Sequence, residues 1–256
     1  MQDFSIEKRD DGILLFTIRR EEKRNAINYA VMDGLKEAIE MAGQPDVKGL
    51  VVTGEGEKAF CAGGDLSVFQ NLRTAEQAYG MLSKMGNILY ELFMLPKPTV
   101  ALMNGTALGG GCELATACDF RVARTGVKAG FVQGTLAITS GWGGGTMLLE
   151  KLPLANAMKM LFEAKRYTAE ELKELGFVHY IYDGDTEDGL STIAHIFQLR
   201  AGVLEAYKEM MIRKWRDKNL KEKIDEEIQK CAILWADDEH HELVDQFVNK
   251  KAKTEK

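Results

Sequence analysis

Few cysteines, prolines and histidines occur in this 256-residue chain, and each shortage excludes a class of protein. The cysteines are too few and too widely spaced for a disulfide framework, and their spacing fits no zinc site. The histidines form no HExxH pattern, since His240 and His241 are adjacent. We therefore expect a reduced protein without a bound metal. The four cysteines are Cys61, Cys112, Cys118 and Cys231.

Neither an excess of positive charge nor a long apolar run is present. Lys and Arg number 33 against 39 Asp and Glu, which gives a net charge of −6. This balance argues against a nucleic-acid partner, because phosphates are neutralised by clustered Lys and Arg. No apolar run approaches the roughly 18 residues needed to cross a bilayer, so we expect no membrane span. The first segment, MQDFSIEKRDDG, is too acidic and polar for a signal peptide, which predicts a cytoplasmic protein.

Glycine and proline are unevenly distributed along the chain. Glycines gather at 54–64, 105–111 and 141–145, only four of the 25 lie beyond position 150, and no proline follows Pro153. This shift predicts a glycine-rich front part of about 150 residues and a helix-rich back part. We expect a core over 1–190 and a helical C-terminal region over 191–256. The back part holds an apolar stripe that could belong to the core or to a subunit interface: Ile224, Ile228, Ile233 and Trp235.

Hydrophobic patterns predict an α/β fold. Alternation on either side of Asp10-Asp11-Gly12 predicts a hairpin. Short apolar runs predict buried strands at 47–54, 98–105 and 118–124, and another strand is expected at 177–183. Because helical patterns alternate with these strands, a mostly parallel sheet is expected. The helices predicted with definite limits cover 29–42, 154–163, 168–175, 186–214, 219–236 and 238–250.

The glycine-rich segments match no nucleotide-binding motif well. The run from Gly54 to Ala59 fits the dinucleotide fingerprint formally, but no helical pattern follows it. A GxxxxGK phosphate loop is absent, and so is the GxSxG of serine hydrolases. Nucleotide binding and serine-based hydrolysis are therefore poorly supported.

Two glycine-rich loops remain, at 60–66 and 104–114, and each follows a strand. The second loop leads into an apparent helix, whose first N–H groups lack intrahelical partners and can bind an anion. A pair of such loops could direct two backbone N–H groups at one oxygen, which would form an oxyanion hole for an enolate. Alternatively, the glycines only turn the chain and let helix pack on strand.

Five segments, taken together, resemble the crotonase superfamily, which is the enoyl-CoA hydratase/isomerase group. They are residues 21–28, 59–66, 96–123, 140–149 and 246–253. The resemblance spans nearly the whole chain and implies a crotonase (ClpP-like) α/β spiral of ββα units with a helical C-terminal region that forms trimers or dimers of trimers. It implies an enzyme that acts on an acyl-CoA thioester, with coenzyme A as part of the substrate and no separate cofactor.

The resemblance also implies roles for individual residues. The backbone N–H groups of Gly64 and Gly110 would hold the thioester oxygen as it becomes an enolate. Phe247 and Lys250 match residues that reach the coenzyme A of a neighbouring subunit, although Lys250 lies in a lysine-rich tail, where simple solvation is the alternative. The residues expected along the path of coenzyme A and the adjoining groove are Lys23, Arg24, Ala26, Ala62, Asp65, Leu66 and Ser67. The thiols of Cys61 and Cys112, inside the two loops, are expected to be small buried groups without a chemical role.

The sequence departs from the hydratases of this family at one catalytic position. Those enzymes use two carboxylates; here the first is Glu113, and Gln133 replaces the second. No Asp or Glu occurs from Phe120 to Leu149, so no shift of the alignment restores the missing group. An amide does not transfer protons, and we therefore expect poor ordinary hydration. Isomerisation with one carboxylate stays open, and Glu113 could instead only stabilise the N-terminus of its helix.

Decarboxylation is the sharpest specific alternative. Superfamily members that decarboxylate methylmalonyl- or ethylmalonyl-CoA also lack the second carboxylate, and residues 116–123 and 141–146 resemble the ethylmalonyl type. The reaction requires an oxyanion hole and a carboxylate turned out of the thioester plane. Trp142 would then help to form a small apolar pocket for that carboxylate, or it only packs beside a glycine turn. A non-catalytic chain that binds CoA esters or a partner protein is the remaining alternative.

Overall fold

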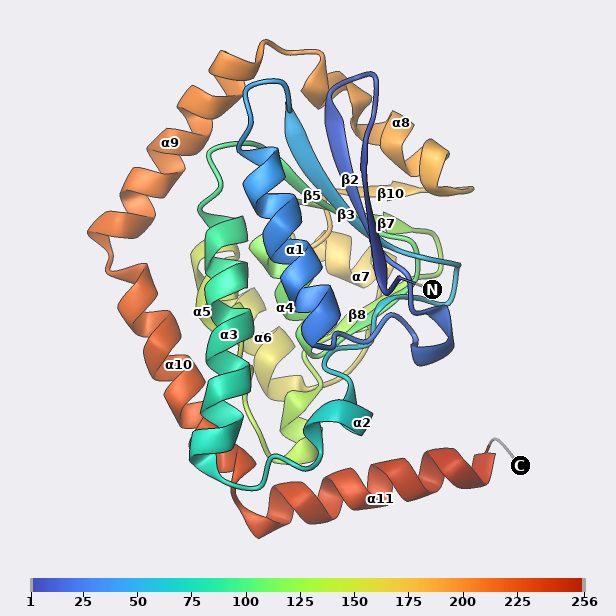
Figure 1. Cartoon of the computed structure of the whole chain (residues 1–256), viewed down its shortest axis with the longest axis vertical. Coiled ribbons are helices and arrows are strands. Elements are labelled where there is room, and N and C mark those ends of the chain that lie inside the picture. Colours follow the sequence, from blue (N-terminus) through green and yellow to red (C-terminus); the bar gives the residue numbers. More distant parts are fainter. Residues whose placement is uncertain (1, 255–256) are drawn as a thin grey trace.

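In the computed structural model, which describes residues 2–254 and side chains up to residue 249, helices surround two β-sheets (Figure 1). In the larger sheet β1 pairs with β2 in antiparallel fashion and the other pairings are parallel. Its strands, in spatial order, are β1 (Phe4–Lys8), β2 (Ile13–Ile18), β3 (Gly49–Gly54), β5 (Thr99–Met103), β7 (Phe120–Arg124) and β10 (Tyr180–Tyr182). Those of the smaller sheet are β4 (Ala59–Cys61), β6 (Thr106–Leu108), β8 (Lys128–Gly130) and β9 (Tyr167–Thr168). The predicted hairpin, buried strands and parallel sheet are confirmed.

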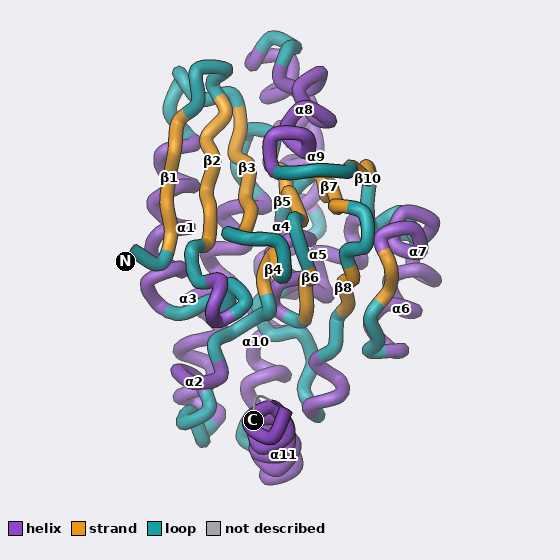
Figure 2. Tube along the Cα trace, turned by 90° about the vertical axis from the view of Figure 1, so that its right-hand side faces the viewer, coloured by secondary structure: helices purple, strands orange, loops and turns teal. Residues whose placement is uncertain are grey.

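A three-part unit recurs along the chain: a strand of the larger sheet, a short strand of the smaller sheet, and then helix. Strand β4 follows β3 in this way, β6 follows β5, and β8 follows β7, so the three short strands lie together beyond the ends of the long ones (Figure 2). The expected ββα units are therefore present. The helical segments that follow the short strands are α2 (Leu66–Phe69) with α3 (Ala75–Phe93), α4 (Gly110–Ala117), and the 3-10 turn η2 (Gln133–Leu136) with α5 (Gly144–Lys151).

The remaining helices cover the sheets and the C-terminal side of the molecule. The single helix predicted over 186–214 is wrong, because the chain turns at Arg200, whose ψ of 133° is extended, and forms two helices. The first of them packs Ile193 and Phe197 on one face of the larger sheet, whereas the second packs Trp215 on Phe93 in the main core. These helices are η1 (Glu21–Lys23), α1 (Tyr29–Ala42), α6 (Leu154–Glu163), α7 (Ala169–Glu174), α8 (Thr186–Phe197), α9 (Ala201–Asp217), α10 (Leu220–Trp235) and α11 (Asp238–Thr254).

The C-terminal helices share the main core with the sheets. Helix α10 packs along α3, where Ile224 and Ile228 are fully buried, while Ile233 is 62% exposed. Three of the four residues of the predicted stripe, including Trp235, are therefore core. Helix α11 extends away from the body of the molecule (Figure 1). The division into 1–190 and 191–256 stays a prediction. In the part of the chain described, no helix is both long and apolar enough to cross a bilayer.

Candidate active site

The two glycine-rich loops meet because the short strands that precede them are parallel neighbours. Strand β4 pairs with β6, so residues that follow Cys61 and Leu108 leave the same edge of the smaller sheet. A side chain at Gly63, whose φ is +96°, would lie 3.2 Å from the backbone nitrogen of Gly110. This close approach requires glycine on both counts. The sequence placed both loops after strands but did not predict the short strands that bring them together.

The backbone N–H groups of Gly64 and Gly110 are both available to a ligand. Gly64 forms a parallel β-bridge with Ile27. The Ile27 N–H donates to the Gly63 oxygen (2.8 Å), and the Asp65 N–H donates to the Ile27 oxygen (2.9 Å). The Gly64 N–H, which lies between these two bonds, therefore points away from Ile27. Gly110 begins α4, where helix geometry leaves its N–H unpaired. Within residues 2–254 neither N–H donates to a protein acceptor.

Trp142 covers the two glycines. A Cβ atom at Gly110 would lie 2.2 Å from Cζ3 of the indole, and one at Gly64 would lie 3.6 Å from Cζ2. The side chain is buried, yet its Nε1–H has no acceptor among the described residues. A buried donor without a partner costs free energy unless a ligand supplies the acceptor. Trp142 is thus next to the predicted oxyanion hole, as expected, and offers a polar atom as well as an apolar ring.

Glu113 is bound by the backbone of a neighbouring loop. Its carboxyl accepts hydrogen bonds from the N–H groups of Gly141 (3.3 Å), Trp142 (2.8 Å) and Gly144 (2.9 Å), and the last of these begins α5. Glu113 therefore stabilises the N-terminus of α5 rather than that of its own helix, α4. Burial, followed by repulsion from Glu227, raises the pKa of Glu113 to about 7, although the three N–H bonds oppose the rise.

Gln133 faces Glu113, at the two positions where the resemblance placed the carboxylates of hydratases. Its Nε2 donates to Oε1 of Glu113 at 2.9 Å, so each oxygen of that carboxyl accepts two N–H bonds. The amide must point its nitrogen at the carboxylate, and this leaves the Gln133 Oε1 buried without a donor in the described structure. In addition to the N–H groups of Gly64 and Gly110, the described side chains of the site present one unpartnered donor, on Trp142, and one unpartnered acceptor, on Gln133.

The segment expected to line the path of coenzyme A lies beside the first glycine loop. The N–H of Ala62 donates to the carbonyl oxygen of Arg24 at 3.1 Å. Ala26 is buried, whereas Lys23 and Arg24 are exposed and can reach a ligand. Leu66 is partly exposed at the start of α2.

Asp65 is occupied by interactions within the protein. It accepts a hydrogen bond from Arg20 (2.8 Å) and caps α2 through the N–H and hydroxyl of Ser67. Burial alone would raise its pKa, but the bonds from Ser67 and Arg20 hold the pKa of Asp65 below its usual value. Asp65 therefore holds the loop in place as an anion, and Ser67 supports it.

The other predicted groups are further from the glycines. Phe247 is half exposed on α11, and the side chain of Lys250 lies outside the described residues. Cys61 and Cys112 are buried, as predicted, and burial raises the pKa of both thiols, that of Cys61 to about 12. Neither thiol is a nucleophile at neutral pH. Within residues 2–254 no cluster of three or more His, Cys, Asp or Glu could hold a metal ion.

One acidic residue near this site was missed by sequence reasoning. Glu227, on α10, accepts hydrogen bonds from the N–H groups of Gly145 (3.2 Å) and Thr146 (2.7 Å). A signal existed, since Glu227 falls at helical spacing between the buried Ile224 and Cys231 and so lies on the apolar face of its helix.

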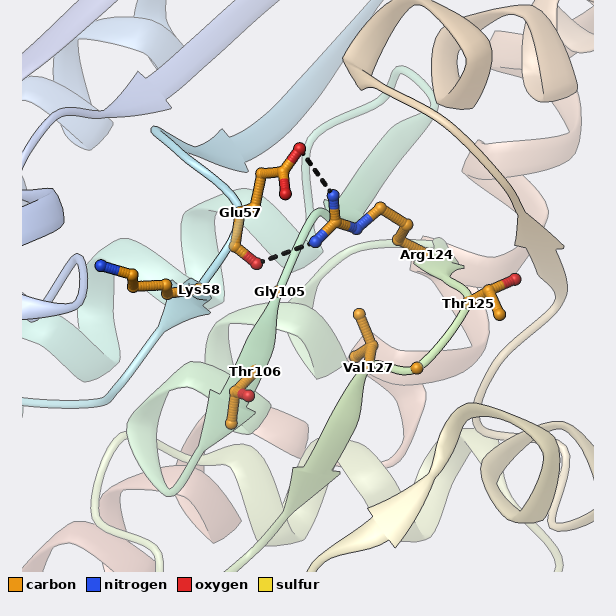
Figure 3. Close-up of a pocket in the computed structure, with 8 residues that line it drawn as sticks. Glu57, Lys58, Gly105, Thr106, Arg124, Thr125 and Val127 are labelled. Atoms are coloured by element: carbon orange, nitrogen blue, oxygen red, sulfur yellow. Dashed lines mark hydrogen bonds and ion pairs between the residues drawn. The ribbon is translucent and has the colours of Figure 1, made fainter.

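A small polar pocket at the opposite ends of the short strands is separate from the site formed by Gly64 and Gly110. It lies where β6 and β8 begin, and Arg124 there pairs with the Glu57 carboxylate at 3.1 Å (Figure 3). Because the glycine loops follow the opposite ends of β4 and β6, this pocket does not include Gly64 or Gly110. It is lined by Glu57, Lys58, Gly105, Thr106, Arg124, Thr125, Gly126 and Val127.

Comparison with known proteins agrees with this geometry. A sequence model of the enoyl-CoA hydratase/isomerase family matches residues 8–255. The chain belongs to this family. Ethylmalonyl-CoA decarboxylase of Xenopus laevis is 34% identical over 236 residues, which cover 90% of this chain and 78% of that protein. The short-chain-enoyl-CoA hydratase of Clostridium acetobutylicum is 32% identical over 180 residues, which cover 70% and 68%.

Solved structures of the family share the fold. A carnitinyl-CoA hydratase from Mycobacterium avium superposes with a TM-score of 0.82 at 28% identity and covers 98% of this chain and 97% of its own. An enoyl-CoA hydratase from Bacillus halodurans gives a TM-score of 0.85 at 22% identity, with 95% and 99% covered. The predicted crotonase spiral with a helical C-terminal region is therefore confirmed, as is the family to which the sequence was assigned.

Proposed function

We propose that this acyl-CoA-processing enzyme decarboxylates a short branched malonyl-CoA ester, such as methylmalonyl- or ethylmalonyl-CoA. The observation that carries the proposal is the state of Glu113. Each of its oxygens already accepts two N–H bonds, and the residue at the second carboxylate position is an amide. Addition of water to an enoyl thioester needs a free base for the water, and such a base is lacking here. The resemblance to ethylmalonyl-CoA decarboxylase of Xenopus laevis supports the same reading.

The backbone N–H groups of Gly64 and Gly110 act as the oxyanion hole in this proposal. When the bond between the α carbon and the carboxylate breaks, its electron pair moves into the thioester and forms an enolate, and CO2 leaves. The two N–H groups stabilise the negative oxygen, and the α carbon then takes a proton from water. Loss of one such donor typically costs about 2.7–4 kcal/mol of transition-state stabilisation. The substrate carries coenzyme A, and the reaction needs no further cofactor.

Trp142 selects the carboxylate of the substrate in this proposal. Its Nε1–H is buried without an acceptor, and its ring lies against both glycines, so a carboxylate next to the thioester would meet one donor in an apolar setting. A single hydrogen bond from Nε1–H orients the carboxylate. The apolar ring leaves the carboxylate poorly solvated, which favours its departure as neutral CO2.

Replacement of the donor alone tests this role. In Trp142→Phe an aromatic ring remains, but the N–H is lost. A hydrogen bond to a charged group is worth about 1.5–3 kcal/mol, so we expect kcat/KM for ethylmalonyl-CoA to fall about 10- to 100-fold. Tyr207→Phe, which removes a polar hydrogen from an exposed side chain, is the matched control. An unchanged kcat/KM in a folded Trp142→Phe would refute the role of the donor.

Hydration is the second candidate, because Glu113 is retained and several relatives are named as hydratases. It predicts rapid turnover of crotonyl-CoA by the unaltered chain. A non-catalytic role in binding CoA esters predicts binding of both types of ester without turnover.

We further propose that the chain assembles as a trimer or a dimer of trimers, in which Phe247 and Lys250 reach the coenzyme A of a neighbouring copy. Exposed apolar side chains on α6 recur at the spacing of one helical turn and support such an interface: Leu154, Met158 and Phe162. The mass of the particle in solution, measured by light scattering, tests the proposal, and a monomer would contradict it. Cytoplasmic localisation, with no nucleic-acid or membrane partner, stays a prediction.

A further inference from the structure

Two carboxyl groups from distant parts of the chain bind the start of one helix. Glu113, on α4, accepts the N–H of Gly144, and Glu227, on α10, accepts the next two N–H groups, those of Gly145 and Thr146. A side chain at Gly144 would collide with Glu113, and one at Gly145 would lie 3.4 Å from Oε2 of Glu227. The two carboxyls therefore occupy successive positions around the N-terminus of α5.

No cation balances this pair in the described structure. The other groups that face it are neutral: the Gln133 amide, the Cys231 thiol and the hydroxyls of Ser140 and Thr146. Neither carboxyl forms an ion pair with a described Lys, Arg or His. Burial raises the pKa of both groups, and repulsion by Glu227 adds to the rise at Glu113. Because two like charges repel each other strongly in such a setting, the pair favours the state with a single negative charge.

The hydrogen bonds indicate which partner carries the proton. Each oxygen of Glu113 already accepts two N–H bonds, so a proton there would displace one of them. Each oxygen of Glu227 accepts only one N–H bond. Glu227 also meets the hydroxyls of Ser140 and Thr146, and a hydroxyl oxygen can accept a hydrogen bond from a protonated carboxyl group. With the proton on Glu227, Glu113 stays negative and keeps its bonds to the loop that carries Trp142.

We propose that Glu227 is a positioning residue of the site: it shares a single proton with Glu113 across the N-terminus of α5, and so sets the charge of Glu113 and the position of the Trp142 loop. This inference deepens the proposed decarboxylation, and only its kinetic readout rests on that function. The helix that covers α3 thereby contributes to the site through a residue distant from it in sequence.

Infrared titration of the whole protein tests the shared proton without any turnover. The C=O stretch of a buried carboxylic acid should disappear as the last proton leaves the pair. In Glu227→Gln, which keeps an oxygen for the N–H groups of α5, one charge is gone, so the midpoint of this loss should move down by about one pH unit or more. Glu226→Gln removes the exposed neighbouring carboxylate and should leave the midpoint unchanged. An unchanged midpoint in Glu227→Gln would overturn the proposal.

The kinetic readout separates positioning from a purely structural role. If decarboxylation is the reaction, the pH profile of kcat/KM should shift in Glu227→Gln in the same direction as the infrared midpoint. A uniform loss at every pH, with the midpoint unmoved, would show that Glu227 only holds the fold. If ethylmalonyl-CoA is not turned over at all, the proposed function fails, while the infrared result still decides for or against the shared proton.

Discussion

Single residues at the site act through their backbone surroundings as much as through their own chemistry. Glu113 has the residue type of a catalytic base, but three backbone N–H groups and the Gln133 amide bind it. A carboxylate bound in this way is poorly placed to take a proton from water, because proton uptake would break a hydrogen bond. The sequence motifs predict a site at Glu113, Gln133 and the glycines, but a one-dimensional pattern cannot show that Glu113 binds α5.

Substitution of Gly110 tests the packing of Trp142 on the oxyanion hole. In Gly110→Ala the new methyl group would meet Cζ3 of Trp142 at 2.2 Å, so the ring must move. Because a displacement of about 1 Å can cost 10²-fold in rate, we expect kcat/KM to fall at least that far while the protein still folds. Gly80→Ala, where the methyl group meets open space on α3, is the control and should retain full activity. Full activity in Gly110→Ala would mean that Trp142 is not part of the site.

Replacement of Gln133 by Glu tests the missing carboxylate. In Gln133→Glu the donor to Glu113 becomes a second carboxyl at hydrogen-bond distance, which removes one of the two hydrogen bonds to Oε1 of Glu113 and supplies a group that can transfer a proton. We expect hydration of crotonyl-CoA to rise, by up to about 10²-fold, in an assay by absorbance. If a folded variant gives no gain, the amide is not what limits hydration.

At the level of elements, the short strands β4 and β6 position the two loops. Each has three residues, too few for a hydrophobic period to be recognised in a sequence, whereas the longer β3 and β5 were predicted from their apolar runs. The contacts that join the larger sheet to the smaller sheet cannot be predicted from such patterns either. Asn104, between β5 and β6, accepts the N–H of Gly54 and the hydroxyl of Thr53. It also donates to the Gly56 oxygen at 2.6 Å.

Removal of the Asn104 side chain should therefore destabilise the turn that leads into β4. In Asn104→Ala the buried N–H of Gly54 loses its acceptor, which typically costs about 1–3 kcal/mol. Urea unfolding should show that loss, and Asn87→Ala on the exposed face of α3 should show little change. Equal midpoints for the two variants would argue that Asn104 does not hold the layers together.

At the scale of the whole molecule, the family could be predicted because its motifs occur in the expected order along nearly the whole chain. The limits of α8 and α9, and the approach of Glu227 from α10, depend on tertiary packing and were not predictable from local pattern. The helical C-terminal region is part of the same core that supports the glycine loops, and through Glu227 it also contacts the start of α5.

The carboxyl pair should make global stability depend on pH. Burial raises the pKa of both carboxyls, that of Glu113 to about 7, so the folded state keeps a proton on the pair at pH values where the unfolded state has lost it, and stability should fall as pH rises through that range. His179, whose pKa burial lowers to about 4, gives the opposite slope, since its charged form is disfavoured in the folded state. The difference between the wild type and Glu113→Gln in urea unfolding from pH 4.5 to 7 isolates the first effect. If the free energy of unfolding changed with pH equally in the wild type and in Glu113→Gln, the raised pKa of Glu113 would be contradicted.

The most direct test of the proposed function is to incubate the purified protein with ethylmalonyl-, methylmalonyl- and crotonyl-CoA in separate reactions and to follow the acyl products by mass. We expect the malonyl-type esters to lose the mass of CO2 at many turnovers per enzyme while crotonyl-CoA gains water slowly. Rapid hydration of crotonyl-CoA with the malonyl-type esters untouched would contradict it, and would mean that Glu113 acts as a base despite its four hydrogen bonds.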